Sequence, residues 1–221
     1  MNQKALIAEF IGTFTLIFVG VGSIAASSIA GAQSGLVGIA LAHGLALAVM
    51  ITATAAVSGG HLNPAVTVGL LAAKKITVTT AVQYVIAQCI GAIVAAALIK
   101  GCVPVDILNA VNLGVPALAP NVTPMMGLTT EAILTFFLVF TVYGTAVSKH
   151  APKMGGLFIG LAVTMGILVA GPTTGAAMNP ARHLGPALVG GSLANIWIYW
   201  VGPLIGGVLG ALAYHKAIEL K

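Results

Sequence analysis

Two long segments of this chain contain almost none of the side chains that keep a protein surface in water. Between Ala5 and Lys74 the only Asp, Glu, Lys or Arg is Glu9, and between Met154 and His215 the only one is Arg182. The chain is 59% hydrophobic and 6% charged, with a mean hydropathy of +1.09. A water-soluble domain of this size cannot bury so much apolar surface, so we expect an integral membrane protein.

Gly, Pro and Lys residues divide the apolar sequence into six windows that are long enough to span a membrane. These are approximately residues 5–29, 36–58, 80–100, 128–148, 155–171 and 195–215. Two further apolar segments, 63–73 and 179–190, are too short to span, because a span needs about 20 residues. We expect them to be re-entrant half-helices, buried in protein or lining a water-filled cavity. The predicted fold is all-α, with six transmembrane helices and two half-helices.

Both short segments begin with the triplet Asn-Pro-Ala. It occurs as Asn63, Pro64 and Ala65 and again as Asn179, Pro180 and Ala181. Asn is favoured at the N-cap of a helix and Pro at the first helical position, so each triplet predicts a helix start. The first N–H groups of a helix lack partners and have partial positive charge, so inside a membrane they need polar surroundings. The two triplets indicate a polar site built by duplication.

The two halves of the sequence repeat each other. Glu9, Gly38 and Gly44 recur as Glu131, Gly160 and Gly166 at an offset of 122, and the triplets recur at an offset of 116. Because each half has three spans, the second copy must be inverted in the membrane. We therefore expect a single domain over residues 1–221. The first repeat covers about 1–100, an external connecting loop about 101–127, and the second repeat about 128–221.

The lysines predict the orientation of the chain. In the six-span arrangement one side has Lys4, Lys74, Lys75, Lys149, Lys153, Lys216 and Lys221, and the other side has only Lys100. Cytoplasmic loops have the excess of Lys and Arg in membrane proteins, so both termini are expected in the cytoplasm, and the expected location is the cell membrane. The net charge of +5 is scattered rather than gathered in a patch, so nucleic acid is not an expected partner.

No pattern in the sequence predicts a cofactor, a metal site or a catalytic centre. Cys89 and Cys102 are expected to be unpaired thiols, and no set of side chains has metal-ligand spacing. No nucleophile is accompanied by a base, so we expect no enzymatic activity.

The sequence around the triplets resembles the aquaporin (major intrinsic protein) family over essentially the whole chain. The matching motifs are Ser58-Gly59-Gly60-His61-Leu62-Asn63-Pro64-Ala65-Val66, Asn179-Pro180-Ala181-Arg182, Ala8-Glu9-Phe10 and Tyr199-Trp200-Val201-Gly202-Pro203. The resemblance implies half-helices that enter from opposite faces and meet at the midplane. It implies a passive pore that conducts water and excludes protons and ions, in a homotetramer. Each asparagine would cap its own helix and leave its side-chain NH₂ for a passing water.

The resemblance also implies a selectivity filter around Arg182. An arginine inside a membrane needs water or a partner, and this one lies one helical turn into the second half-helix. Spacing from the triplets assigns the other filter positions to His43, Ile167 and Ala176. Water-only relatives have Phe and His at the first two positions. Glycerol channels have aromatic residues at the first and third, and Asp where this chain has His183.

This set of filter residues is closer to that of the plant vacuolar aquaporins. It predicts a somewhat wider water pore, one that also passes small neutral solutes such as glycerol, urea, ammonia or hydrogen peroxide. Mercury-sensitive relatives often have Cys at the position of Ala176, so we do not expect mercury to block the pore there. Cys89 remains another route for mercury.

Glu9 and Glu131 are acids at matching positions inside apolar spans. A proton relay is one interpretation. Their symmetry favours a structural role in which each accepts N–H groups from the irregular segment before its half-helix. His61 is expected to have a structural role or to line the pore. His150 is expected to be a solvated loop histidine, and pH sensing is the alternative role for it.

Three other functions are compatible with parts of this pattern. A glycerol-type facilitator would have the same fold with a different filter. A secondary transporter can also have inverted repeats and broken helices, but this chain lacks an obvious cation-coupling cluster. A junctional membrane protein would need more surface outside the membrane than these short termini and loops provide.

Overall fold

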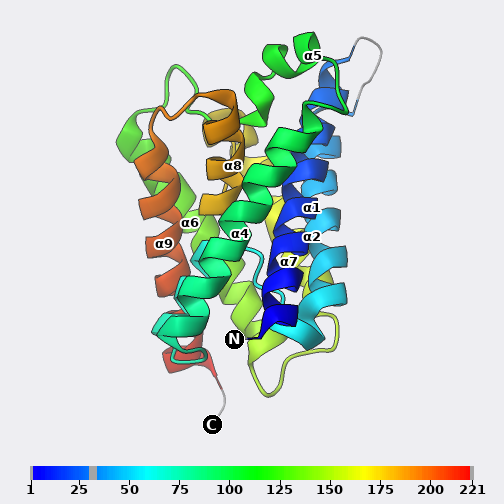
Figure 1. Cartoon of the computed structure of the whole chain (residues 1–221). Coiled ribbons are helices and arrows are strands. Elements are labelled where there is room, and N and C mark those ends of the chain that lie inside the picture. The colour runs from blue at the N-terminus through cyan, green and yellow to red at the C-terminus, as the bar shows by residue number, and fades with distance from the viewer. Residues whose placement is uncertain (1, 30–33, 220–221) are drawn as a thin grey trace.

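The computed structural model describes residues 2–29 and 34–219, and within them all regular structure is helical (Figure 1). Among these described residues, six helices are long and apolar enough to cross a membrane, which confirms the predicted number of spans. They are α1 (Gln3–Ser28), α2 (Gly35–Ser58), α4 (Val78–Ile99), α6 (Pro124–Val142), α7 (Gly155–Thr174) and α9 (Ile196–Ala213). Short π-helical turns, Tyr143–Val147 and Tyr214–Ile218, extend α6 and α9.

Two short helices begin at the triplets, as predicted. They are α3 (Pro64–Ala72) and α8 (Pro180–Gly190), and in each one Pro is the first helical residue. The region predicted as a loop at 101–127 is partly helical, because it contains α5 (Val105–Ala110) and a 3₁₀ turn over Asn112–Gly114. A segment as short as α5 has little apolar periodicity from which to predict a helix.

The observed helix ends differ from the predicted windows where capping residues decide them. The fourth span begins at Pro124 rather than 128, because the Thr123 side chain accepts a hydrogen bond from Met126 N and Pro124 fits the first turn. The fifth span continues past Pro172 to Thr174 and ends at Gly175, whose φ of 81° suits a glycine C-cap.

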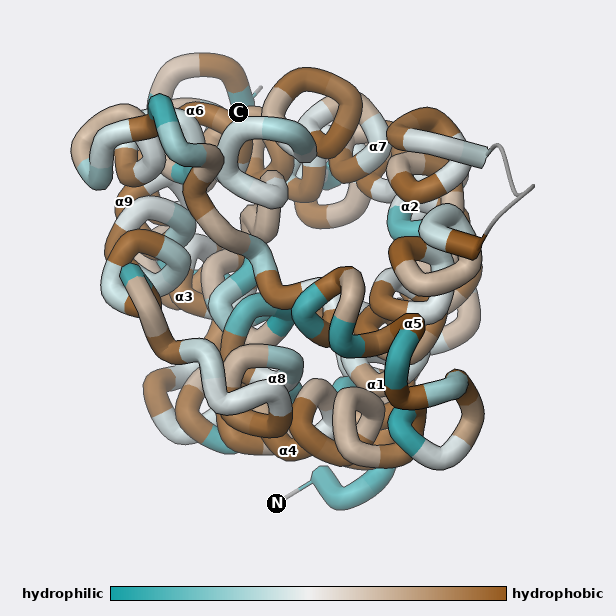
Figure 2. The backbone as a smooth tube through the Cα atoms, turned by 90° about the horizontal axis from the view of Figure 1, so that it is seen from above, coloured by the Kyte–Doolittle hydropathy of each residue, from teal (hydrophilic) through white to brown (hydrophobic). Residues whose placement is uncertain are grey.

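The helices pack with an approximate twofold symmetry that matches the sequence repeat. In each half, the first span packs against the second and the third: α1 against α2 and α4, and α6 against α7 and α9. The second spans of the two halves, α2 and α7, pack against each other. Each half-helix packs against the last span of the other half, α3 against α9 and α8 against α4. Viewed from above, α3 and α8 lie inside the ring of long helices (Figure 2).

Glycines let the paired helices approach closely. On α9, the ladder of Gly202, Gly206 and Gly210 faces backbone carbonyl groups of α6, and a Cβ on Gly210 would lie 2.5 Å from the Phe136 oxygen. Gly156 and Gly160 face α2 in the same way. This is the close contact expected of small residues at helix interfaces in membranes.

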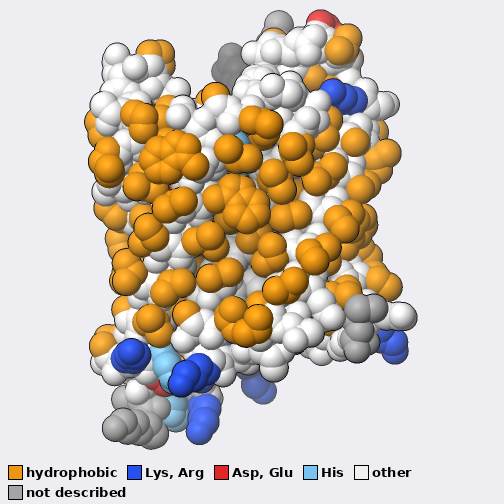
Figure 3. Space-filling model, turned by 60° about the vertical axis from the view of Figure 1, so that its left-hand side comes forward, with side chains coloured by type: hydrophobic (Ala, Val, Ile, Leu, Met, Phe, Trp, Pro, Cys, Tyr) orange, Lys and Arg blue, Asp and Glu red, His pale blue; other side chains and the backbone are white. Residues whose placement is uncertain are grey.

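The outer surface has an apolar band with charge at its two ends. Both termini lie at one end of the molecule, which we call the terminal end, and α5 lies at the other, the α5 end (Figure 1). Lys side chains gather at the terminal end in the face that Figure 3 shows, with hydrophobic side chains between the ends. The predicted lysine asymmetry includes Lys221, which lies outside the described residues.

Candidate functional site: a passage between two half-helices

The N-termini of α3 and α8 meet through their capping asparagines. Asn63 Oδ1 accepts the Ala65 N–H at 2.8 Å, and Asn179 Oδ1 accepts those of Ala181 and Arg182 at 3.0 and 3.2 Å. Each amide nitrogen then reaches across to the other half: Asn63 Nδ2 donates to Met178 O at 2.8 Å, and Asn179 Nδ2 donates to Leu62 O at 3.0 Å.

These reciprocal contacts correct one expectation from the sequence. The whole NH₂ of each asparagine was expected to remain for a ligand, whereas one N–H of each amide is used between the halves. An amide has two N–H donors, so one remains on each asparagine. Both Asn63 and Asn179 line a cavity, which places these donors beside the passage.

The irregular segments before the half-helices have matching backbone conformations. Leu62 has a φ of 52° and its equivalent Met178 a φ of 48°, while Gly60 and its equivalent Ala176 have φ values of 62° and 43°. Residues with side chains rarely adopt this left-handed conformation, so surrounding contacts must stabilise it.

Glu9 supplies these contacts in the first half. Its Oε1 accepts hydrogen bonds from Ser58 Oγ at 2.6 Å and His61 N at 2.9 Å. Its Oε2 accepts from Leu62 N and Gln88 Nε2, each at 2.7 Å. The carboxylate is fully buried, and four donors surround it.

Glu131 has the equivalent position in the second half. Its Oε1 accepts from Thr174 Oγ1 at 2.8 Å and Ala177 N at 3.0 Å, and its Oε2 accepts from Met178 N at 2.8 Å. Tyr84 and Tyr199 complete the equivalence, because their hydroxyls donate to Ser58 O and Thr174 O. The contacts of both acids are those of a structural support for the irregular segments.

Two adjoining cavities approach the half-helices from the α5 end. The outer one, of about 270 Å³, lies against the connecting segment, and the inner one, of about 20 Å³, reaches Asn63 and Asn179. His43, Ile167 and Arg182 line both cavities, and Ala176 lines the inner one. The structure therefore brings together the four side chains that the sequence resemblance assigned to a filter.

A neighbouring glycine and backbone carbonyl groups hold the side chains of His43 and Arg182 in place. His43 Nδ1 donates to Ile39 O at 2.9 Å, so the neutral ring has its lone pair on Nε2. A Cβ on Gly20 would collide with that Nε2, so only glycine leaves room for the ring. Arg182, only 4% exposed, donates from Nη1 to Gly114 O at 2.9 Å.

Sequence reasoning missed the role of Gly114. It lies in the segment expected to be a connecting loop, after Asn112 and Leu113, and all three have positive φ. Asn and Gly tolerate this conformation, which was the one available signal for a tight curl in this segment.

His61 is a buried residue that packs beside the first half-helix. Its Nδ1 lies 3.1 Å from Thr67 Oγ1, and its ring packs edge-on against Tyr84 at 5.1 Å between centroids. These contacts support the first half-helix. Neither of the two cavities that His43 and Arg182 line has His61 in its wall.

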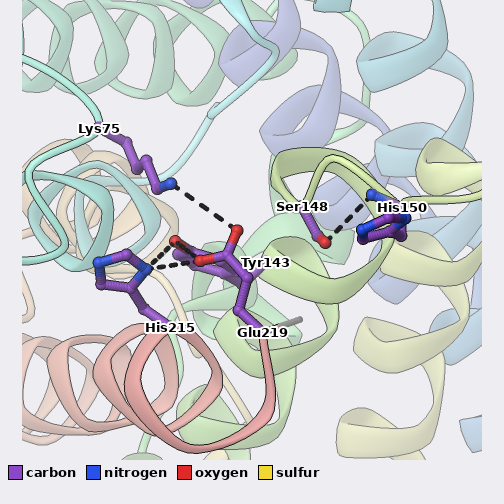
Figure 4. Close-up of polar contacts among 6 residues, drawn as sticks. All are labelled: Lys75, Tyr143, Ser148, His150, His215 and Glu219. Carbon is purple, nitrogen blue, oxygen red and sulfur yellow. Dashed lines mark hydrogen bonds and ion pairs between the residues drawn. The ribbon is translucent and has the colours of Figure 1, made fainter. Parts of the chain in front are cut away.

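A polar cluster at the terminal end ties three segments together. Figure 4 shows it: Tyr143, after α6, donates to Glu219 Oε2 at 2.9 Å, and His215 Nδ1 lies 2.6 Å from that same oxygen. Lys75, after α3, lies 3.9 Å from Glu219 Oε1 and 5.3 Å from the centre of the Tyr143 ring. His150 lies apart, where its backbone N–H contacts Ser148 Oγ.

The structure offers no grouping of side chains suited to a metal ion in the part of the chain that it describes. Within residues 2–29 and 34–219, no three His, Cys, Asp or Glu residues are gathered for one. Cys89, partly buried, and Cys102, exposed, are both free thiols.

Comparisons with known proteins place this geometry among membrane channels. The family model described as "Major intrinsic protein" matches residues 1–214. The chain is 46% identical to aquaporin TIP4-4 of Zea mays over 220 residues, covering 96% of this chain and 85% of that protein. It is 42% identical to aquaporin-4 of Mus musculus over 228 residues, covering 99% of this chain and 69% of that protein.

A solved structure has the same fold. The aquaglyceroporin from Plasmodium falciparum superposes with a TM-score of 0.90 at 26% sequence identity, covering 99% of this chain and 97% of that one.

Proposed function

Because the chain belongs to the major intrinsic protein family and is a membrane channel of the aquaporin type, we propose that water crosses the bilayer between the N-termini of α3 and α8. The observation that carries this proposal is the placement of Asn63, Asn179 and Arg182 in the walls of adjoining cavities. Flow is passive and follows the osmotic gradient. The chain acts as a channel rather than as an enzyme.

The two asparagines explain how water can pass while protons and cations do not. Each has a free N–H beside the passage, so a water at the midplane accepts hydrogen bonds from both and directs its own protons away from them. Two helix N-termini add partial positive charge at the same point, which repels cations. This is the general scheme for aquaporin-type pores.

His43, Ile167, Ala176 and Arg182 are proposed to decide which solutes pass. Ala176 is small and Ile167 lacks the polarity of the His in water-only relatives, so the filter admits small neutral solutes besides water. Arg182 excludes cations through its charge. Similarity to proteins named aquaporins, at 42–46% identity, supports water over glycerol as the main permeant.

The lysine distribution supports an orientation. We place the terminal end in the cytoplasm and the α5 end outside the cell, because the lysine-bearing segments at the start of α1, after α3, between α6 and α7, and after α9 lie at the terminal end (Figure 1). Their lysines are Lys4, Lys74, Lys75, Lys149, Lys153 and Lys216. The proposed assembly is a homotetramer in the cell membrane with one pore in each subunit.

Stopped-flow light scattering on proteoliposomes tests the channel. An osmotic step made with an impermeant sugar should shrink vesicles containing the full chain much faster than empty vesicles, with no dependence on a proton or sodium gradient. Rates equal to those of empty vesicles would contradict the channel, and gradient dependence would favour a transporter.

The same vesicles test the filter. Substitution of Arg182 by Ala should increase urea and glycerol permeability more than water permeability, because it removes the charged wall of the narrow region. An unchanged ratio of solute to water permeability would contradict the filter role. Lys100→Ala is the matched control, because Lys100 is a basic residue whose Nζ donates to Val189 O away from the proposed filter.

A further inference from the structure

The side chain four residues after each capping asparagine, Asn63 or Asn179, is buried, and its hydrogen bonding differs between the two halves. In the first half it is Thr67, whose Oγ1 accepts from Gln88 Nε2 at 3.0 Å and lies 3.1 Å from His61 Nδ1. In the second half it is His183, which has no exposed surface. Neither ring nitrogen of His183 has a hydrogen-bond partner among the described residues.

The equivalence of the two halves at this place rests on contacts. Tyr84 and Tyr199 donate to equivalent carbonyl groups, which fixes an offset of 115 between α4 and α9. Gln88 therefore corresponds to Pro203, and at the offset of 116 His61 corresponds to Ala177. Neither Pro nor Ala has a side chain that can hydrogen-bond to His183.

Because of this difference, Glu9 and Glu131 receive different hydrogen-bond donors. Gln88 Nε2 bridges Glu9 Oε2, at 2.7 Å, and Thr67 Oγ1. Among the residues that the structure describes, Glu131 Oε2 accepts a hydrogen bond only from the Met178 N–H, and no side chain replaces the donor that Gln88 supplies in the first half. Glu131 Oε2 and the His183 ring are therefore the counterparts of the two atoms that Gln88 Nε2 bridges in the first half. Among the described residues no side chain bridges them.

The second half also has less side-chain bulk at this place. Each half contributes one histidine. The first half adds Thr67 and Gln88, whereas the second adds only Ala177 and Pro203. Buried polar atoms without partners are costly, and buried waters in proteins typically bridge two to four such atoms.

We propose that one ordered water bridges a ring nitrogen of His183 and Glu131 Oε2, where Gln88 Nε2 lies in the first half. The water donates one hydrogen bond to the carboxylate and forms a second hydrogen bond with a ring nitrogen of the imidazole. His183 is thereby a positioning residue for the segment that carries Ala176, so this inference rests on the proposed filter. Tyr199 steadies the ring, since the two are stacked at 4.2 Å between centroids with an interplanar angle of 12°.

A crystal structure of the full chain, at a resolution that shows ordered waters, tests the site directly. The expected result is a density peak within hydrogen-bonding distance of both His183 and Glu131 Oε2. A His183 ring bonded directly to Glu131, or a dry contact between the two residues, overturns the proposal. This result does not depend on permeation, so it stands or fails separately from the proposed function.

Two variants test the positioning role in proteoliposomes. His183→Phe keeps an aromatic ring against Tyr199 and removes both nitrogens, so the ratio of urea to water permeability should rise severalfold. The double variant H183T/P203Q rebuilds the Thr and Gln pair of the first half and should keep the wild-type ratio. A wild-type ratio in His183→Phe overturns the role, and if that variant does not fold, the crystallographic result decides.

Discussion

Arg182 and Gly114 lie 68 residues apart in the sequence and are joined by a 2.9 Å hydrogen bond from Nη1 to the glycine carbonyl oxygen. The bond ties Arg182, on α8, to the segment that connects the two repeats. The carbonyl reaches Arg182 because three successive residues, Asn112, Leu113 and Gly114, adopt left-handed conformations. The connecting segment therefore forms part of the wall of the outer cavity, which Arg182 also lines.

Gly114→Ala should loosen the filter. Gly114 has a φ of 64°, and an added Cβ would lie 3.1 Å from Ile24 Cδ1, so the carbonyl should shift away from Arg182. We expect a loss of about 1 kcal/mol of stability from the left-handed conformation and a higher ratio of urea to water permeability. Gly191→Ala is the control, because Gly191 has a φ of 73° with open space around it. Equal ratios in both variants would contradict the prediction.

His43→Phe combined with Ile167→His should narrow the pore. These changes install the residues that water-only relatives have at the first two filter positions. Urea and glycerol permeability of proteoliposomes should fall severalfold while osmotic water permeability is largely kept. If all three permeabilities fall together, the pair does not control selectivity.

Ala176→Cys should make the pore sensitive to mercury. Ala176 lines the inner cavity, so a thiol there would bind mercury inside the passage. Mercuric chloride should block water permeability in the variant, and a thiol reagent should restore it. In the unmodified chain Cys89 is partly buried and Cys102 is exposed. Block of the unmodified chain that disappears in Cys89→Ser would show a second route for mercury.

Glu131→Gln and Glu9→Gln should both destabilise the chain. The Gln amide places an NH₂ against N–H donors that now point at a carboxylate, and each unsatisfied buried donor costs about 1–3 kcal/mol. The loss should be larger for Glu9→Gln, since both Glu9 oxygens accept two hydrogen bonds. Thermal unfolding in detergent measures this order, with Asp106→Asn as an exposed control. Unfolding temperatures equal to that of the control would indicate that neither acid is a structural support.

The cluster at the terminal end should make stability depend on pH. The hydrogen bond with His215 lowers the pKa of Glu219, and the contact with the Tyr143 hydroxyl raises the pKa of Lys75. A lowered carboxyl pKa stabilises the fold above the ordinary value of 4.5 and loses its effect as pH falls through the lowered pKa. A raised lysine pKa stabilises below the ordinary 10.5 and is lost as pH rises through the raised one.

At pH 7 the unfolding temperature of Glu219→Gln should therefore be lower than that of the unmodified chain, and the two temperatures should converge in acid. The comparison is made in detergent over a pH series, with Asp106→Asn, at an exposed acid, as a control for the change in net charge. A difference that stays constant down to acid pH would contradict the ionic role of Glu219.

Much of the fold could be predicted because its signals are local. The six spans follow from hydropathy, and the two half-helix starts follow from Asn at the cap and Pro at the first turn. Thr123 followed by Pro124 carried a similar local signal for the start of α6, which the hydropathy window placed too late. The short helix α5 had no such signal.

The sequence by itself determined the number of spans, their duplication and the starts of the two half-helices. Hydropathy and helix caps depend on neighbouring residues, and the duplication appears when the two halves are compared. Only the tertiary structure decided which backbone groups receive Asn63, Asn179 and Arg182. The donors and acceptors of those bonds lie 68–117 residues apart. Such partners are selected by packing, because inside a membrane each polar group must find its partner within the protein.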